Sequence, residues 1–140
     1  MNRIFKFSEI NFEDCEQCYK KGLYATKKNA VSIWHFSSGQ ELPLHKHTTG
    51  DDIWIVIAGE GEYLWSEQED LENTYEPNPK KVVLPPEKVY IKCNKRKIGK
   101  NTIIVNEAGV FHGLRNNSSE QLVIVSIEGP LPIGGLYTSR

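Results

Sequence analysis

The chain has 140 residues, of which 39% are hydrophobic and 25% are charged, and its formal net charge is −1. This length and composition predict one globular domain with a hydrophobic core. No overall positive charge attracts nucleic acid or an anionic membrane, so we expect neither as a partner. The first residues, MNRIFKFSEINFED, contain no apolar run of the kind found in secretory signals. We therefore expect a soluble, cytoplasmic protein.

Residues 1–28 are expected to form an N-terminal extension to this domain. The segment NFEDCEQCYKKG favours a short helix that ends at Gly22, and an added strand is the alternative. Cys15 and Cys18 form a C-x-x-C pair, which occurs in zinc sites and in redox centres. No second pair completes a zinc site, and acidic neighbours disfavour the reactive thiolate. We expect ordinary reduced cysteines.

Residues 29–128 have the pattern of short strands. Runs rich in Val, Ile and Trp are separated by segments rich in Gly, Asn and Ser, and the clearest of them read AVSIWHF, DIWIVIAGEGEYLW, NTIIVNEAG and QLVIVSIEG. Many short strands joined by turns are typical of a β-sandwich or a β-barrel. We therefore predict an all-β domain.

Two segments interrupt or follow this pattern. Residues 66–100 form a charged, Pro-rich insertion, acidic in its first part and basic in its last. It is expected to be a solvated hairpin, with a lid or a partner-binding arm as the alternative. Residues 129–140 contain two prolines and two adjacent glycines, and are expected to be a C-terminal tail with no regular element of its own.

The prediction of function depends on the histidines. Two of the four, His45 and His47, are one residue apart at the edge of an apolar run. Alternate side chains of a strand share a face, so both imidazoles can point at one metal ion while Lys46 points away. Asp52 begins the next apolar strand, and His112 follows a second glycine turn much later. An H-x-H pair alone is a weak signal, and the spacing of the whole set carries the prediction.

The spacing resembles that of the cupin superfamily, whose members are small jelly-roll β-barrels with two sequence motifs. The first motif is read as Gly39, five residues, His45-Lys46-His47, four residues, Asp52, six residues and Gly59. The second is read as Glu107-Ala108-Gly109, two residues, His112, three residues and Asn116. Glu107 stands where the family usually has proline, and Asn101 where it usually has glycine. The resemblance implies a single-domain cupin-type barrel over residues 29–128, and a homodimer, which is common among small cupins.

The resemblance also implies one divalent transition metal ion, held by His45, His47, Asp52 and His112. Neutral imidazoles and one carboxylate suit Fe, Mn, Ni, Zn or Cu. The family usually has Glu at the position of Asp52. The shorter side chain therefore lies closer to the metal, acts through water, or leaves three histidines as the site. Asp51 is the competing carboxylate, and Asp52 is preferred because it keeps six residues before Gly59.

Other residues near the motifs are candidates for supporting roles. The aromatic candidates for lining a substrate pocket are Trp54, Phe111, Tyr63 and Trp65, although such side chains more often belong to the core. The polar candidates for a hydrogen bond to a metal ligand are His35, Asp51 and Asn116. The sequence identifies no separate catalytic acid or base.

These features favour a metal-dependent enzyme acting on a small oxygen-chelating metabolite. The reaction expected is of the dioxygenase, isomerase or decarboxylase type. The alternative is a non-catalytic cupin that binds or senses a small molecule or a sugar, because one barrel hosts many functions. In both cases the partner is a small-molecule ligand or substrate.

Overall fold

The computed structural model describes residues 2–12, 14–67 and 93–136 of the chain. Within them the chain is nearly all β. A short 3-10 helix, η1 (Phe7–Glu9), precedes eight strands: β1 (Tyr19–Ala25), β2 (Ala30–Phe36), β3 (Glu41–Ala58), β4 (Glu60–Ser66), β5 (Asn94–Gly99), β6 (Ile103–Asn106), β7 (Phe111–Arg115) and β8 (Leu122–Leu136). The all-β prediction is confirmed.

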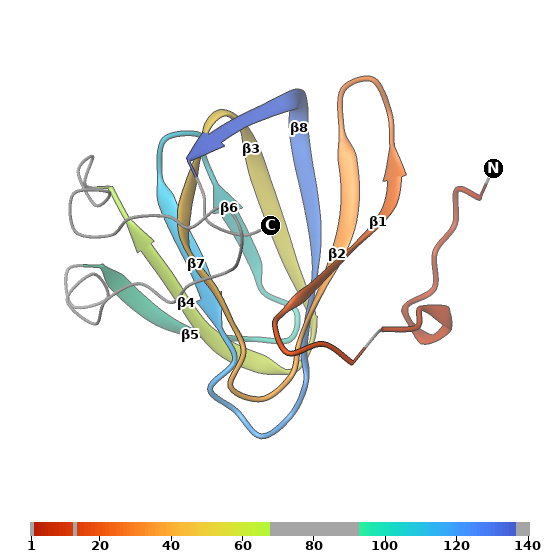
Figure 1. Cartoon of the computed structure of the whole chain (residues 1–140), viewed down its shortest axis with the longest axis vertical. Helices are drawn as coiled ribbons and strands as arrows, with labels where there is room; N and C mark the ends of the chain where they lie inside the picture. The colour runs from red at the N-terminus through yellow and green to blue at the C-terminus, as the bar shows by residue number, and fades with distance from the viewer. Residues whose placement is uncertain (1, 13, 68–92, 137–140) are drawn as a thin grey trace.

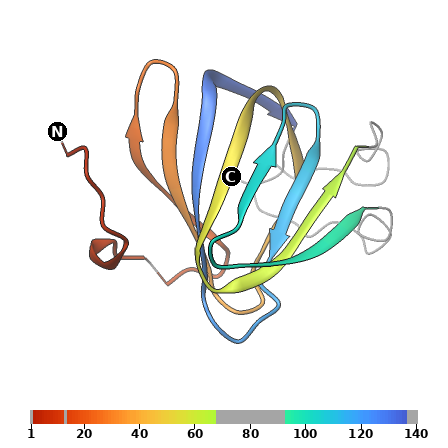
Figure 2. The same ribbon diagram turned by 180° about the vertical axis from the view of Figure 1, so that it is seen from behind.

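The strands form a sheet that folds into two layers around the long strand β3 (Figure 1). The order of hydrogen-bonded neighbours is β1-β2-β8-β3-β7-β4-β5, and every pair is antiparallel. The strand β6 pairs with β3 outside this order, and it is seen beside β3 from behind (Figure 2). The strand β8 pairs along most of β3, whereas β7 pairs only with its first residues (41–45) and β6 only with later ones (52–55). The residues of β3 therefore belong to both layers.

Gly50 lies where β3 passes from one layer to the other. Its φ is +80°, a conformation that glycine adopts at little cost, and the β3–β8 pairing shifts register on either side of it. A Cβ atom added at Gly50 would lie 2.2 Å from Cδ1 of Ile133. The bend therefore depends on glycine at this position, between His47 and Asp52.

The core lies between the layers. Trp34 and Phe36 of β2 pack in one cluster with Trp54 and Val56 of β3. These residues are two apart in each strand, so the alternation seen in the sequence is the alternation between the inside and the outside of the barrel. Burial of such large apolar side chains supplies most of the driving force for folding.

Two turns show why the motif positions need particular residues. Gly59 has a φ of +81°, and an added Cβ would lie 2.0 Å from the carbonyl oxygen of Gln121. Asn101, at the position where the family usually has glycine, has a φ of +71°. Asparagine tolerates this left-handed conformation better than most residues, so the turn keeps its geometry without glycine.

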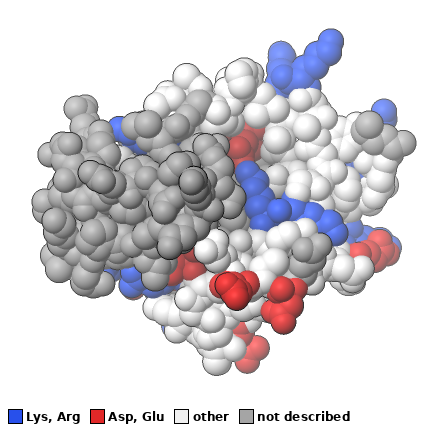
Figure 3. Space-filling view, in the orientation of Figure 1, with Lys and Arg blue, Asp and Glu red and all other residues white. Residues whose placement is uncertain are grey.

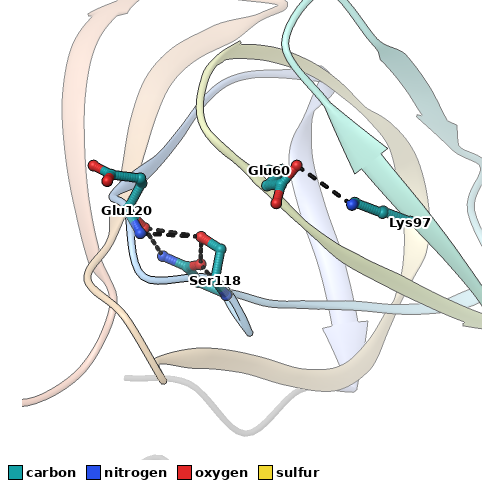
Figure 4. Close-up of polar contacts among 5 residues, drawn as sticks. Glu60, Lys97, Ser118 and Glu120 are labelled. Carbon is teal, nitrogen blue, oxygen red and sulfur yellow. Dashed lines mark hydrogen bonds and ion pairs between the residues drawn. The ribbon is translucent and has the colours of Figure 1, made fainter.

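The surface carries charges of both signs, which are mixed on the face seen in Figure 3. Figure 4 shows the ion pair between Lys97 and Glu60, whose nitrogen and oxygen lie 3.5 Å apart. Both side chains are largely exposed, so the pair adds little stability. The same view shows the turn between β7 and β8, where the Ser118 hydroxyl donates to the carbonyl oxygen of Glu120.

Three segments flank or interrupt the regular strands of the predicted barrel. The N-terminal part contributes β1, the added strand, which pairs with β2. Residues 129–136, expected to have no regular element, instead continue β8 to Leu136 and pair with β3. Most of the predicted insertion, residues 68–92, lies outside the described residues. No helix in the described part of the chain is long and apolar enough to cross a membrane.

Candidate metal centre

Three histidines converge inside the barrel. His45 and His47 come from β3, and His112 comes from β7, where it is the cross-strand partner of His45. The ring centroid of His45 lies 4.3 Å from that of His112 and 5.4 Å from that of His47. One nitrogen from each ring lies within 4.8 Å of the others, and all three side chains are buried. The fold thus brings together the three imidazoles that the motifs predicted.

Backbone carbonyls fix the orientation of two of these rings. Nδ1 of His45 lies 2.8 Å from the carbonyl oxygen of Pro43, and Nδ1 of His112 lies 2.9 Å from that of Val110. A carbonyl only accepts, so each Nδ1 must carry the proton and donate it. Nε2 of each ring then carries the lone pair that can bind a metal, the arrangement usual for metal-binding histidines.

Nε2 of His112 has no hydrogen-bond partner among the described residues, although it is buried. Buried polar atoms are almost always satisfied, so an unsatisfied one calls for a missing partner. A metal ion in contact with all three rings would supply that partner. The donor set therefore fits a divalent transition metal ion.

The electrostatics of the site favour the metal-binding form of the histidines. Burial lowers the pKa of His45 to about 4 and the pKa of His112 well below its usual range. Burial also lowers the pKa of His47. The imidazoles are therefore neutral near pH 7, and no proton has to leave before a metal binds.

Asp52 and Asp51 have opposite environments. Asp52 is buried, and its Oδ1 accepts a hydrogen bond of 2.6 Å from the hydroxyl of Ser126. Burial raises the pKa of Asp52 to about 6, although the bond from Ser126 acts in the opposite direction. Asp51 is exposed and accepts a bond from the backbone N–H of Ala108. The carboxylate of Asp52 faces inward but is not part of the group formed by the three histidines.

The four aromatic candidates differ in how they lie relative to the histidines. Trp54 packs against His112, with ring centroids 5.3 Å apart, and Tyr63 and Trp65 stack on one another at 5.2 Å. Trp65 is also the cross-strand partner of His112. Phe111 belongs to a different cluster and contacts Lys46, whose ammonium lies 4.8 Å from its ring centroid. Phe111 thus lies in a different cluster from Trp54 and Tyr63.

His35 and Asn116 lie away from the three histidines. Nε2 of His35 bonds to Oε1 of Gln121, and its ring stacks on Phe12, outside the core. Asn116 is buried, and its side-chain N–H groups donate to the carbonyl oxygens of Phe36 and Glu120. Asn116 therefore supports a turn, and neither residue is seen to contact a histidine of the site.

The structure adds polar residues that the sequence analysis missed. The hydroxyl of Tyr63 and Oδ1 of Asn106 lie 2.5 Å apart, and Asn106 is the cross-strand partner of Asp52. Lys20 and Glu128 form an ion pair, and Glu128 is a cross-strand partner of Asp52. Asn106 could have been found from its place at the end of an apolar strand. Lys20 could not, because its segment favoured a helix.

No protein-family model matches the sequence, and a comparison with curated proteins finds no match. Solved structures do match. A conserved protein with a double-stranded β-helix domain from Klebsiella pneumoniae superposes with a TM-score of 0.72 at 24% identity, covering 100% of both chains. An RmlC-like cupin from Desulfovibrio desulfuricans has a TM-score of 0.58 at 16% identity, covering 90% of this chain and 95% of its own.

An oxalate oxidase in complex with the substrate analogue glycolate has a TM-score of 0.65 at 15% identity. The match covers 96% of this chain and 62% of the oxidase. These similarities establish the fold class, because identities this low say little about function. The chain has the double-stranded β-helix fold of the cupins, and the jelly-roll barrel expected from its two motifs is confirmed.

Proposed function

We propose that the protein is a metal-dependent enzyme that acts on a small oxygen-chelating metabolite. The observation that carries this proposal is the group of three buried, neutral histidines, one of which has a buried Nε2 without a partner among the described residues. Such a group is costly to bury unless something binds it. His45, His47 and His112 would hold one divalent transition metal ion.

When bound, such an ion supplies a Lewis acid that polarises the oxygens of a chelating substrate. The surrounding residues of the chain would set access and orientation. Trp54 packs against His112 and Tyr63 packs against Trp54, so aromatic side chains lie beside the histidine group. Asp52 places a carboxylate at the inner surface, and its raised pKa of about 6 suits it to exchange a proton near neutral pH.

The similarity to an oxalate oxidase that holds glycolate supports a small carboxylic acid or hydroxy acid as the substrate class. A dioxygenase, isomerase or decarboxylase reaction would fit such a substrate, and the identity of the metal separates these types. Iron favours reactions with O₂, whereas zinc, nickel or manganese favours isomerisation or decarboxylation.

Metal content is the first test. Protein purified without an affinity tag should contain about one equivalent of a transition metal by mass spectrometry, and His112→Ala should lose it. His35→Ala is the matched control, because His35 lies outside the core and should not affect the metal. A metal-free wild-type protein that stays metal-free after reconstitution would contradict the proposal.

Turnover is the second test, because it separates an enzyme from a binding protein. Iron-loaded protein should be assayed for oxygen uptake, and protein with other metals for isomerisation or decarboxylation, across a panel of hydroxy and keto acids. Tight binding of one of these acids without turnover under any metal would favour a sensing function instead.

A further inference from the structure

An ion pair links the first strand of the barrel to the last. Nζ of Lys20 on β1 lies 2.5 Å from Oε1 of Glu128 on β8. The Glu128 side chain is only 13% exposed, whereas the Lys20 side chain is 38% exposed. The pair therefore stands at the border between the interior and solvent.

The pair faces the same side of the sheet as the core. Lys20 is the cross-strand partner of Trp34, and its ammonium lies 5.5 Å from the Trp34 ring centroid. Glu128 is the cross-strand partner of Asp52, and directly paired residues share a face of the sheet. Both charged side chains therefore belong to the inner surface that carries Asp52.

Packing contacts connect Lys20 with the candidate metal centre. Trp34, which lies under the Lys20 ammonium, packs in one cluster with Trp54, and Trp54 packs against His112 with ring centroids 5.3 Å apart. A ligand bound at the histidines would therefore share the inner surface of the barrel with the Lys20 ammonium.

A second donor is available on the same surface. Nδ2 of Asn106 is buried and has no hydrogen-bond partner among the described residues, while Oδ1 of Asn106 is bonded to Tyr63. Asn106 pairs with the opposite side of β3 from Glu128, so Glu128, Asp52 and Asn106 form one row across three strands. An unsatisfied N–H donor and an ammonium group on one inner surface suit the oxygens of an anion.

Stability alone does not explain the pair. A partly buried ion pair loses much of its solvation, and well-packed apolar side chains at the same place are usually as stable or more so. A role in binding an anionic ligand would account for charged groups at this place.

We propose that Lys20 is the residue that binds the carboxylate of the substrate, and that the substrate carries this carboxylate in addition to the group that chelates the metal. In the free protein Glu128 holds the Lys20 ammonium in place. The substrate carboxylate then replaces Glu128 as the partner of this ammonium, or binds it together with Glu128. It also accepts a hydrogen bond from Asn106. This inference rests on the proposed metal site, and it narrows the substrate class to small acids with two separate oxygen-donor groups.

Two small hydroxy acids that differ only in the second carboxylate can test this proposal. Malate and 2-hydroxybutyrate both chelate a metal through a hydroxyl and a carboxylate, but malate has a second carboxylate where 2-hydroxybutyrate has a methyl group. Binding of each to cobalt-loaded protein can be followed by the visible spectrum of the metal, with no need for turnover. We expect malate to bind about 10-fold more tightly than 2-hydroxybutyrate, as for one charge-assisted hydrogen bond.

Three variants test the assignment. Lys20→Met should bind malate and 2-hydroxybutyrate equally, whereas Lys20→Arg should keep most of the preference. Glu128→Gln should strengthen the preference, because it removes the competing carboxylate. Lys21→Met is the matched control, since Lys21 is on the other face of β1 and contacts Asn11, and it should leave the preference unchanged.

The outcomes separate the two proposals. If the protein binds cobalt but does not prefer malate, or if Lys20→Met keeps the preference, the carboxylate assignment is wrong while the metal site stands. If the wild-type protein binds no cobalt, both proposals fail. A weaker malate preference in Glu128→Gln would also contradict the role given to Lys20.

Discussion

His45 and His112 are cross-strand partners whose ring centroids lie 4.3 Å apart, and the same kind of local hydrogen bond orients each ring. In both, Nδ1 bonds to the carbonyl oxygen of the residue two positions earlier, which is Pro43 within β3 and Val110 directly before β7. The rings are thus oriented by their own strands, without help from a ligand. A site prepared in this way loses little conformational entropy when a metal binds.

Metal binding should therefore stabilise the protein strongly. A free metal concentration 100 times the dissociation constant adds about 2.7 kcal/mol to the free energy of unfolding. We expect the midpoint of thermal unfolding to rise with metal in the wild-type protein and to stay unchanged in His45→Ala. Lys46→Ala is the control, because Lys46 lies between the two histidines of β3 but contacts Phe111. An equal rise in His45→Ala would place the metal elsewhere.

The metal-free protein should lose stability as the pH falls below 6.5. The folded-state pKa of His45 is about 4, below the unfolded value of 6.5, so the unfolded state takes up protons first. The stability that neutral His45 contributes is present above pH 6.5 and is lost as the pH falls towards 4, at a cost of about 3 kcal/mol. His112 acts in the same direction.

Urea unfolding in the presence of a chelator at pH 7.5, 6.5 and 5.5 measures this effect. His45→Gln removes one titrating group, so its free energy of unfolding should depend less steeply on pH than that of the wild-type protein. Identical slopes for the two proteins would show that His45 is not buried in the neutral form.

Gly59→Ala should destabilise the barrel severely. The added Cβ would lie 2.0 Å from a backbone oxygen of Gln121, and the φ of +81° is unfavourable for alanine. We expect a loss of more than about 3 kcal/mol. Gly39→Ala is a matched control, because Gly39 has a similar φ of +84° but open space around it. It should cost only about 1–2 kcal/mol by urea unfolding, and equal losses would contradict the steric argument.

Much of the fold and part of the site could be predicted from the sequence. The alternation of apolar and polar residues was enough to predict the strands of the barrel, and the two spaced motifs were enough to predict the three histidines. Both patterns are local properties of the sequence. The burial of Asp52 and the exposure of Asp51 followed from the same alternation, once the strand was assigned.

The remaining parts depend on contacts between distant segments. Lys20 reaches the inner surface only because β1 pairs with β2, and its own segment had favoured a helix. Asn106 lies next to Asp52 because β6 pairs with β3, which no local pattern specifies. The continuation of β8 to Leu136 was missed because glycines and prolines usually end strands, whereas here Gly129, Gly134 and Gly135 pair with β3 on either side of its bend.

Asp52→Asn should stabilise the metal-free protein at neutral pH. Burial raises the pKa of Asp52 to about 6, above the unfolded value of 3.8, so ionised Asp52 destabilises the fold as the pH rises through 6. Asparagine has no such charge, and its side-chain oxygen can still accept the bond from Ser126. We expect a gain of about 1–3 kcal/mol at pH 7.5 that falls towards zero at pH 4, measured by urea unfolding with a chelator.

Asp52→Asn should also weaken metal binding. It should therefore stabilise the metal-free protein but lower its affinity for the metal. Outer-shell groups of a metal site typically contribute 10-fold or more to affinity, and the buried negative charge of Asp52 favours a cation nearby. We expect Asp52→Asn to raise the dissociation constant for zinc or cobalt by about 10-fold in competition with a chromogenic chelator. Asp51→Asn should leave it unchanged, because Asp51 is exposed and bonds to Ala108. Unchanged affinity in Asp52→Asn would identify a site of three histidines alone.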